Sequence, residues 1–246
     1  MVTKNQKKLI RSLKLKKNRK KHGFFIAEGI KVVNEFLETD LVLEELYVLN
    51  SDVNLFNSVN DNKLIGVSSS ELEQISFLTT SQKALALFKI PNNLKIINEG
   101  LQVVLDDVQD PGNLGTIIRL CDWFGVTNLI CSKTTVDCYN PKVVQATMGS
   151  LTRVNVIYTD LVEYLKESKD PIFGTYMDGD NIYQSELPSS GIIVMGNEAN
   201  GISKEITSLI NNKLTIPRFG ENQKTESLNV ATATSILLSE FKRSNL

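Results

Sequence analysis

The sequence is poor in histidine, in paired cysteines and in long apolar runs. His22 is the single histidine among 246 residues, which excludes a Ser-His-Asp triad in the main body of the chain and a multi-histidine metal site. Cys121, Cys131 and Cys138 form no CxxC pair and leave an odd thiol. A disulfide framework and a cysteine-rich metal site are therefore not expected, and a reducing cytoplasm fits.

Membrane segments are also missing from the sequence. No apolar run approaches the roughly 18 residues needed to span a bilayer, and the basic start lacks the apolar region of a secretory signal. Apolar residues make up 41% of the chain, a usual share for a globular protein with a buried core. We expect a cytoplasmic protein with no membrane partner and no metal.

A concentrated basic segment opens the chain. Residues 1–22 contain ten Lys and Arg and no Asp or Glu, so the remaining 17 basic residues face 28 acidic ones. Such a segment on an acidic body favours a nucleic-acid partner, although a solvated or disordered basic tail is an open alternative. The expected RNA contacts are Arg11, Lys14, Lys16, Lys17, Arg19, Lys20 and Lys21.

The hydrophobic pattern predicts two α/β domains. Short strands near 24–28, 43–50 and 83–90 alternate with helical segments, which indicates a small domain over 1–92. A stretch with Asn and Gly follows and predicts a linker at 93–100. From 101 to 246, apolar strands separated by helices predict a parallel sheet covered on both faces. Candidate helix caps are Ser69 or Ser70, Asn113, Asn140, Asp160 and Ser227.

Three loops after predicted strands are candidates for chemistry, because ligands bind beyond the carboxyl ends of parallel strands. They cover 106–119, 195–203 and 216–231. The second has GxxxxG spacing, but Ile202 stands where a phosphate-loop lysine belongs, and no GxGxxG occurs. Nucleotide triphosphate hydrolysis and dinucleotide binding are therefore poor interpretations. Arg119 has apolar neighbours, which favour partial burial with a fixed role, although a surface salt bridge is an open alternative.

Three segments resemble, in order, the motifs of the SpoU-type branch of the SPOUT class of RNA ribose 2′-O-methyltransferases: DPGNLGTIIRLCDWFG, IIVMGNEANGIS and IPRFGENQKTESLNVATATSILLSEF. This likeness covers roughly residues 100–246. The opening KLIRSLKLKKNRKKHGFFIAEGIKVVNEFL resembles the start of the L30e-like RNA-binding domain that often precedes it. The resemblance implies a knotted α/β domain with a C-terminal trefoil knot, S-adenosylmethionine as cofactor, and a homodimer with the active site at its interface.

The resemblance also implies residue roles. Arg119 matches the proposed catalytic arginine, and we expect its guanidinium, which stays charged, to stabilise the developing 2′-alkoxide. The polar residues that organise the site are Asn113, Glu198, Ser227 and Asn229. The residues expected to hold the cofactor are Thr175, Gly196, Asn197, Ile216 and Leu228.

Two departures from the family and three alternatives bear on these roles. The segment between Pro217 and Ser227 is longer than in the shortest members, and Arg218 stands where an apolar residue is common. The N-terminal domain favours rRNA as substrate over tRNA. Arg119 and the Ser227-Leu228-Asn229 segment favour a ribose over a base nitrogen, and the full polar set favours catalysis over RNA binding alone.

Overall fold

The computed structural model describes residues 1–91, 100–220 and 227–243, in two compact units. The first unit comprises Met1–Asn93 and Asp137–Thr152, and the second comprises Leu94–Val136 and Arg153–Leu246. The predicted linker at 93–100 lies outside the described residues except for Gly100. The sequence gives no sign that 137–152 joins the first unit.

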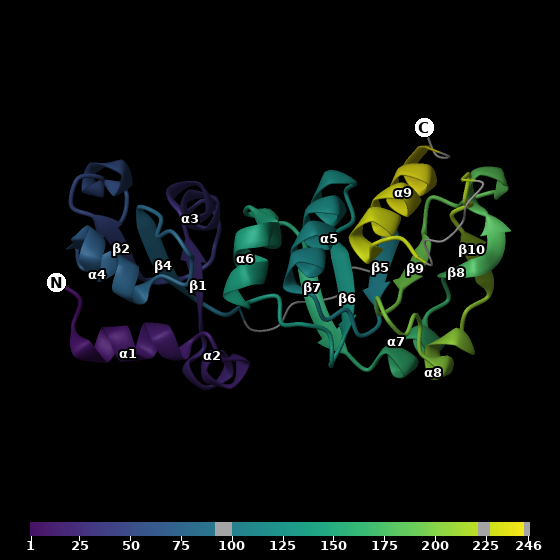
Figure 1. The fold of residues 1–246 in the computed structure, drawn as a ribbon, viewed down its shortest axis with the longest axis horizontal. Helices are drawn as coiled ribbons and strands as arrows, with labels where there is room; N and C mark the ends of the chain where they lie inside the picture. Colours follow the sequence, from purple (N-terminus) through teal and green to yellow (C-terminus); the bar gives the residue numbers. More distant parts are fainter. Residues whose placement is uncertain (92–99, 221–226, 244–246) are drawn as a thin grey trace. The chain divides into compact units, whose positions relative to one another are not determined.

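The first unit is built on a four-stranded mixed sheet (Figure 1). Its strands, in spatial order, are β1 (Phe24–Glu28), β4 (Ala84–Lys89), β2 (Leu43–Leu49) and β3 (Leu64–Val67). Strand β4 is antiparallel to β1 and to β2, whereas β2 and β3 are parallel.

Helices cover both faces of this sheet. Ala84, Ala86 and Phe88 of β4 pack with α3 (Ile30–Leu37) and α6 (Pro141–Thr147) in one core cluster. The alternate residues Leu85 and Leu87 pack with α1 (Lys4–Ser12) and α4 (Ser69–Ile75) in another. Because both faces are buried, the strands read as apolar runs in the sequence.

The basic segment is folded, so the alternative of a disordered tail is wrong. Helix α1 begins at a capping box between Thr3 and Gln6, and α2 (Lys16–His22) ends at Gly23 with φ 73°. A residue without a Cβ adopts this left-handed conformation at little cost. Ile10 and Leu13 are fully buried and anchor α1 to the sheet.

The second unit is a six-stranded, all-parallel sheet, as the alternation of strands and helices predicts. Its spatial order is β10 (Asn212–Thr215), β8 (Ile172–Asn181), β9 (Gly191–Met195), β5 (Leu101–Leu105), β6 (Asn128–Ser132) and β7 (Asn155–Thr159). No helix among the described residues is long and apolar enough to cross a membrane.

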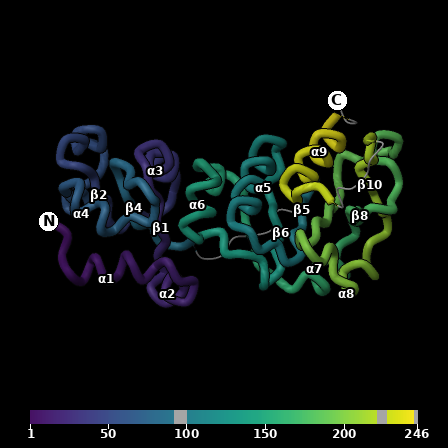
Figure 2. The backbone as a smooth tube through the Cα atoms, in the orientation of Figure 1, coloured from purple at the N-terminus to yellow at the C-terminus, as the bar shows by residue number. Residues whose placement is uncertain are grey.

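Two pairs of helices cover this sheet. Helices α7 (Leu161–Glu167) and α8 (Lys204–Thr207) pack on the face that includes Ile172. The next residue, Phe173, points to the other face and contacts Phe241 of α9 (Val230–Arg243), with ring centroids 5.1 Å apart. Helix α9 lies beside α5 (Pro111–Trp123), and the chain therefore returns from the edge strand β10 toward the middle of the unit (Figure 2).

Three helix caps differ from the predictions, and two are confirmed. Asn140 and Asp160 accept hydrogen bonds from the first turns of α6 and α7. Helix α4 is capped by Ser68, in a box with Glu71, and not by Ser69 or Ser70. The remaining two corrections, at Asn113 and Ser227, fall in the site.

Candidate active site

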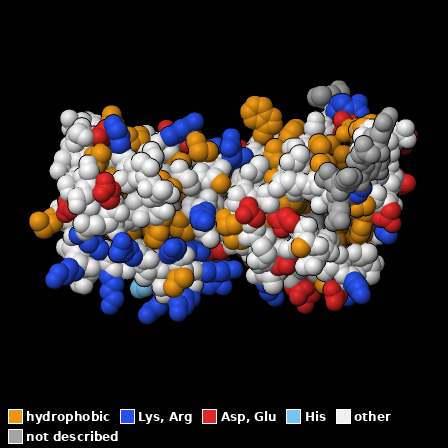
Figure 3. Space-filling view, viewed as in Figure 1, with side chains coloured by type: hydrophobic (Ala, Val, Ile, Leu, Met, Phe, Trp, Pro, Cys, Tyr) orange, Lys and Arg blue, Asp and Glu red, His pale blue; other side chains and the backbone are white. Residues whose placement is uncertain are grey.

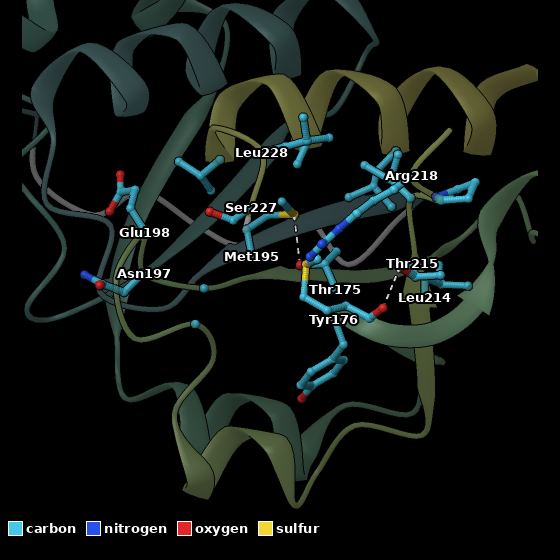
Figure 4. A pocket seen from close by; sticks show the side chains of 18 of the residues that line it. Thr175, Tyr176, Met195, Asn197, Glu198, Leu214, Thr215, Arg218, Ser227 and Leu228 are labelled. Carbon is cyan, nitrogen blue, oxygen red and sulfur yellow. Dashed lines mark hydrogen bonds between the residues drawn. The ribbon is translucent and has the colours of Figure 1, made fainter. Parts of the chain in front are cut away.

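A cavity of about 720 Å³ lies beyond the carboxyl ends of β9 and β10 (Figure 4). Its walls are the segments 175–177, 195–201, 214–220 and 227–228, together with three residues of α9. All five residues expected to hold a cofactor line it, namely Thr175, Gly196, Asn197, Ile216 and Leu228. Glu198 and Ser227 line it as well, whereas Asn113, Arg119 and Asn229 do not.

The loop after β9 is closed on itself and tied to the loop after β5. Backbone hydrogen bonds of 2.9 Å run both ways between Asn197 and Gly201. A Cβ on Gly196 would lie 2.3 Å from the carbonyl carbon of Gly201, so only glycine fits there. The Asn197 side chain donates to the Asp107 carbonyl at 2.7 Å and accepts from the backbone of Ala199. The Asn197 amide thus holds the loop, and its backbone faces the cavity.

An irregularity in β8 forms the opposite wall. Lys213 of β10 pairs with Gly174, but the next residue, Leu214, pairs with Asp180. The intervening residues 175–179 therefore leave the register, and Thr175 turns toward the end of β9, where its hydroxyl lies 3.4 Å from the Val194 carbonyl. The hydrophobic periodicity of the sequence does not predict this bulge between β8 and β10.

A chain of side-chain amides joins the three motif loops. The side-chain oxygen of Asn229 accepts from the backbone of Ala231 and Thr232, so Asn229, and not Ser227, caps α9. Its amide nitrogen donates to the Asn113 side-chain oxygen at 2.9 Å. Asn113 in turn donates to a carboxylate oxygen of Glu198 at 2.8 Å. Capping of α9 thereby orients Asn113 and, through it, Glu198.

Asn113 is free for this contact because it does not cap α5. Asp110 is the N-cap, with Pro111 in the first turn, and its carboxylate accepts from the Asn113 backbone at 2.8 Å. A proline is favoured at this position because it has no backbone N–H to satisfy. The predicted cap is therefore wrong by three residues, and Asn113 lies inside the helix with its side chain turned to Glu198.

Arg119 does not lie in the cavity of its own chain. It is exposed, so the expected partial burial is wrong. Ile117, Ile118 and Cys121 are buried, but they lie on the side of α5 that faces the sheet. Arg119 shares the exposed side of α5 with Trp123, one helical turn away, which is 84% exposed.

Two residues of the site were missed at the end of β5. Asp106 is buried, and its carboxylate accepts from the Ser203 backbone at 2.7 Å, which fixes the start of α8. Asp107 has φ 60°, a left-handed conformation that is uncommon outside glycine. The Ser132 hydroxyl accepts from its backbone N–H, and Asn197 donates to its carbonyl. Paired carboxylates directly after an apolar strand were the available signal.

The basic residues of the first unit form an exposed face on α1 and α2 (Figure 3). Arg19 is the exception among those expected to contact RNA, because its side chain is only 2% exposed. It forms an ion pair with Asp137 and donates to the carbonyls of Leu13 and Lys14 at 2.7 and 2.9 Å. Six of the seven expected contacts remain on the surface: Arg11, Lys14, Lys16, Lys17, Lys20 and Lys21.

Metal ligands and reactive thiols are scarce in the described part of the chain. No group of three or more His, Cys, Asp and Glu that could hold a metal ion occurs there. The three cysteines are buried, and burial raises the pKa of the Cys121 thiol to about 12.

The comparisons with known proteins agree on one family. The model of the SpoU rRNA Methylase family matches residues 100–239, and that of the MRM3-like substrate binding domain matches residues 4–86. The chain is 30% identical over 241 residues to the Bacillus subtilis 23S rRNA (guanosine(2553)-2′-O)-methyltransferase RlmP, covering 96% of this chain and 95% of that protein.

Two solved structures share the fold over nearly the whole chain. One is described as a putative RNA methyltransferase of the TrmH family from Porphyromonas gingivalis, with 37% identity, a TM-score of 0.90 and 99% of each chain covered. The other is the AdoMet-bound rRNA methyltransferase of Sinorhizobium meliloti, with 27% identity and a TM-score of 0.87, covering 100% of this chain and 97% of that one. This chain therefore belongs to the SpoU rRNA methylase family.

Proposed function

We propose that this protein transfers a methyl group from S-adenosylmethionine to a ribose 2′-hydroxyl of rRNA. The observation that carries the proposal is the cavity, which gathers all five residues expected to hold the cofactor and ends at the oriented Glu198 carboxylate. The Bacillus subtilis relative is named as a 23S rRNA 2′-O-methyltransferase, and the Sinorhizobium meliloti structure is an AdoMet-bound rRNA methyltransferase. Both names support the same reaction here.

The cavity fits the proposed cofactor. Its volume falls within the range of about 300–1,000 Å³ that is usual for small-molecule sites. Met195, Leu214 and Leu237 give it apolar walls, while the loops 196–201 and 214–220 bring backbone groups to its edge. When bound, the sulfonium supplies an activated methyl group, so the chain has only to hold and align the partners.

Alignment of the ribose is the role we propose for the amide chain. One Glu198 oxygen is occupied by Asn113, which leaves the carboxylate in one orientation beside the cavity. A fixed carboxylate can accept a hydrogen bond from a ribose hydroxyl and hold it toward the methyl donor. Ser227, which lines the cavity, is the further polar group expected to contact RNA.

We propose a homodimer in which Arg119 of one protomer serves the cavity of its partner. Arg119 lies outside the cavity of its own chain, on the exposed side of α5 that also carries Trp123. A groove between α5 and α9 is lined by Trp123 together with Leu120, Phe124, Tyr183 and Ile236 among others. A large exposed aromatic beside an apolar groove is typical of an interface. In this arrangement the charged guanidinium would stabilise the developing 2′-alkoxide.

The basic face of α1 and α2 is the proposed contact with the RNA backbone. Lysine and arginine side chains bind phosphates without reading sequence, and the affinity falls with salt in proportion to the number of phosphates bound. The match of residues 4–86 to a substrate binding domain supports this role. We assign it to a domain over 1–92, ahead of a methyltransferase domain over 101–246.

Three further properties belong to the same proposal. The return of the chain from β10 to α9 beside α5 fits the C-terminal trefoil knot that the family resemblance implies. We propose a cytoplasmic location, which the bacterial rRNA methyltransferase RlmP among the relatives supports. The chemistry proposed here uses no metal.

The reaction is tested by incubating the purified protein with methyl-labelled S-adenosylmethionine and separate rRNA and tRNA pools. Label recovered as a 2′-O-methyl nucleoside from rRNA is the expected result. Label in tRNA, or in a methylated base, would overturn the substrate or the target atom. Absence of both methyl transfer and cofactor binding would overturn the enzymatic function.

The shared site is tested by mixing two inactive variants. Arg119→Ala removes the guanidinium and Glu198→Gln removes the carboxylate, so a mixed dimer keeps one site with both groups intact. Co-expression is expected to restore up to about half of the wild-type activity per mixed dimer. If the mixture stays as inactive as its components while mixed dimers form, Arg119 does not act across the interface.

A further inference from the structure

Two neighbouring aromatic rings are exposed, Phe219 in the cavity wall and Tyr183 in the groove between α5 and α9 that we assign to the dimer interface. Phe219 lines the cavity and is 83% exposed. The ring of Tyr183, in the short 3-10 helix η3 (Ile182–Gln184), is 42% exposed and lies 6.3 Å away between centroids, tilted by 38°. This spacing is within the range of interacting aromatic pairs. Tyr183 therefore supports Phe219 from the side and leaves most of its surface accessible.

The surroundings of these rings suit a base of the RNA. Met177 and Leu228, 54% and 49% exposed, line the same cavity and add apolar surface. The Arg218 side chain extends across the cavity toward Thr175 (Figure 4), which places a positive charge where a polyanion would enter. Aromatic faces beside cations are how proteins hold unpaired bases.

Phe219 and Tyr183 belong to the second unit, whereas the basic face belongs to the first. Within the described residues of the first unit, no Phe, Tyr or Trp side chain is in the exposed class, although the His22 imidazole at the end of α2 is exposed. The surface of α1 and α2 is dominated by cations that can contact phosphates, with His22 as an exposed ring among them. The aromatic surface instead borders the proposed methyl-transfer cavity, so it is positioned to hold the nucleotide that reacts.

We propose that Phe219, supported by Tyr183, is a stacking platform for the base of the nucleotide whose ribose is methylated. The inference rests on the proposed function and adds a substrate contact to it. With the base on Phe219, the ribose hydroxyl lies between the platform and Glu198. The nucleotide must be unpaired to reach this position, so the platform selects single-stranded or unstacked targets.

The test uses the full-length protein and an rRNA fragment that it methylates. Loss of a stacked base weakens binding by about 5- to 150-fold, so Phe219→Ala is expected to raise the KM for RNA by that factor. The KM for RNA is expected to change by a larger factor than the affinity for S-adenosylmethionine, which calorimetry measures separately. Phe219→Trp keeps a stacking surface and is expected to restore the KM. Leu55→Ala, which removes a 58% exposed apolar side chain from the first unit, is the matched control.

A fluorescent base analogue at the target position gives a readout that a structural role would not move. Its fluorescence is expected to be quenched by stacking in the wild type and to recover in Phe219→Ala. If wild-type protein methylates the fragment while Phe219→Ala leaves both the KM and the quenching unchanged, the platform is refuted and the proposed function stands. If the variant instead becomes monomeric in sedimentation, a second copy covers the ring and the platform is refuted.

Discussion

The buried ion pair between Arg19 and Asp137 gives the sharpest stability prediction. Asp137→Ala removes the carboxylate that pairs with Arg19, whose side chain is 2% exposed. The guanidinium then keeps the carbonyls of Leu13 and Lys14 as its partners among the described residues. Breaking a buried pair on one side leaves a charge without compensation and costs about 3–5 kcal/mol.

We expect the lower end of that range, because two backbone hydrogen bonds to Arg19 persist. A loss of about 3 kcal/mol corresponds to a fall of roughly 12–24 °C in the unfolding midpoint of a domain of this size. Replacing both partners, as Arg19→Met with Asp137→Leu, removes the stranded charge. The double variant is therefore expected to be more stable than Asp137→Ala alone.

The measurement is urea unfolding of four proteins: the wild type, Asp137→Ala, Arg19→Met and the double variant. Unfolding is monitored by a spectroscopic signal from the first unit. Lys83→Ala is the control, since its ion pair with Asp52 has a lysine that is 59% exposed, and such pairs contribute about 1 kcal/mol or less. A loss for Asp137→Ala no larger than that of the control would refute the reasoning from burial.

Three shorter predictions follow from other parts of the molecule. Gly196→Ala should abolish measurable cofactor binding in calorimetry, since its Cβ would lie 2.3 Å from the Gly201 backbone; Gly220→Ala, with nothing within 4 Å, should not. Burial raises the pKa of the Glu28 carboxyl more than its hydrogen bonds lower it, so the wild type should lose stability as pH rises from about 4.3 through the raised value; thermal melts of Glu28→Gln should lack this slope. Ellman's reagent should label no cysteine in the native protein and all three in urea, because all are buried; rapid native labelling would contradict the structure.

Local signals in the sequence were sufficient for the elements and for some of their ends. Asn140 before Pro141, and Asp160 before an amphipathic run, identified the starts of α6 and α7 because capping depends on neighbours in the chain. The cap of α5 was missed because two candidates, Asp110 and Asn113, stand within four residues. Which of the two side chains caps the helix depends on whether the other has a distant partner. Asn113 donates to Glu198, which is 85 residues away in the chain.

Burial of individual charged residues could not be predicted in either direction. Arg19 belongs to a run of cations and looks like its neighbours, yet its partner Asp137 is 118 residues away in the chain. Arg119 has apolar neighbours, yet helical periodicity turns those neighbours inward and leaves Arg119 outside. The gathering of the five cofactor residues came from the family resemblance, because their separation in sequence gives no geometric signal.

The segment 137–152 has a consequence for how the chain matures during synthesis. The first unit needs it, since Tyr139 packs on Phe25 at 4.7 Å between ring centroids and Val144 belongs to the same core cluster. A ribosome must therefore deliver β5 and β6, two of the six strands of the parallel sheet, before the first unit can close its core. Nascent chains shorter than about 150 residues would carry an incomplete first unit. A chimera that exchanges this unit between relatives must transfer both of its sequence segments, Met1–Asn93 and Asp137–Thr152.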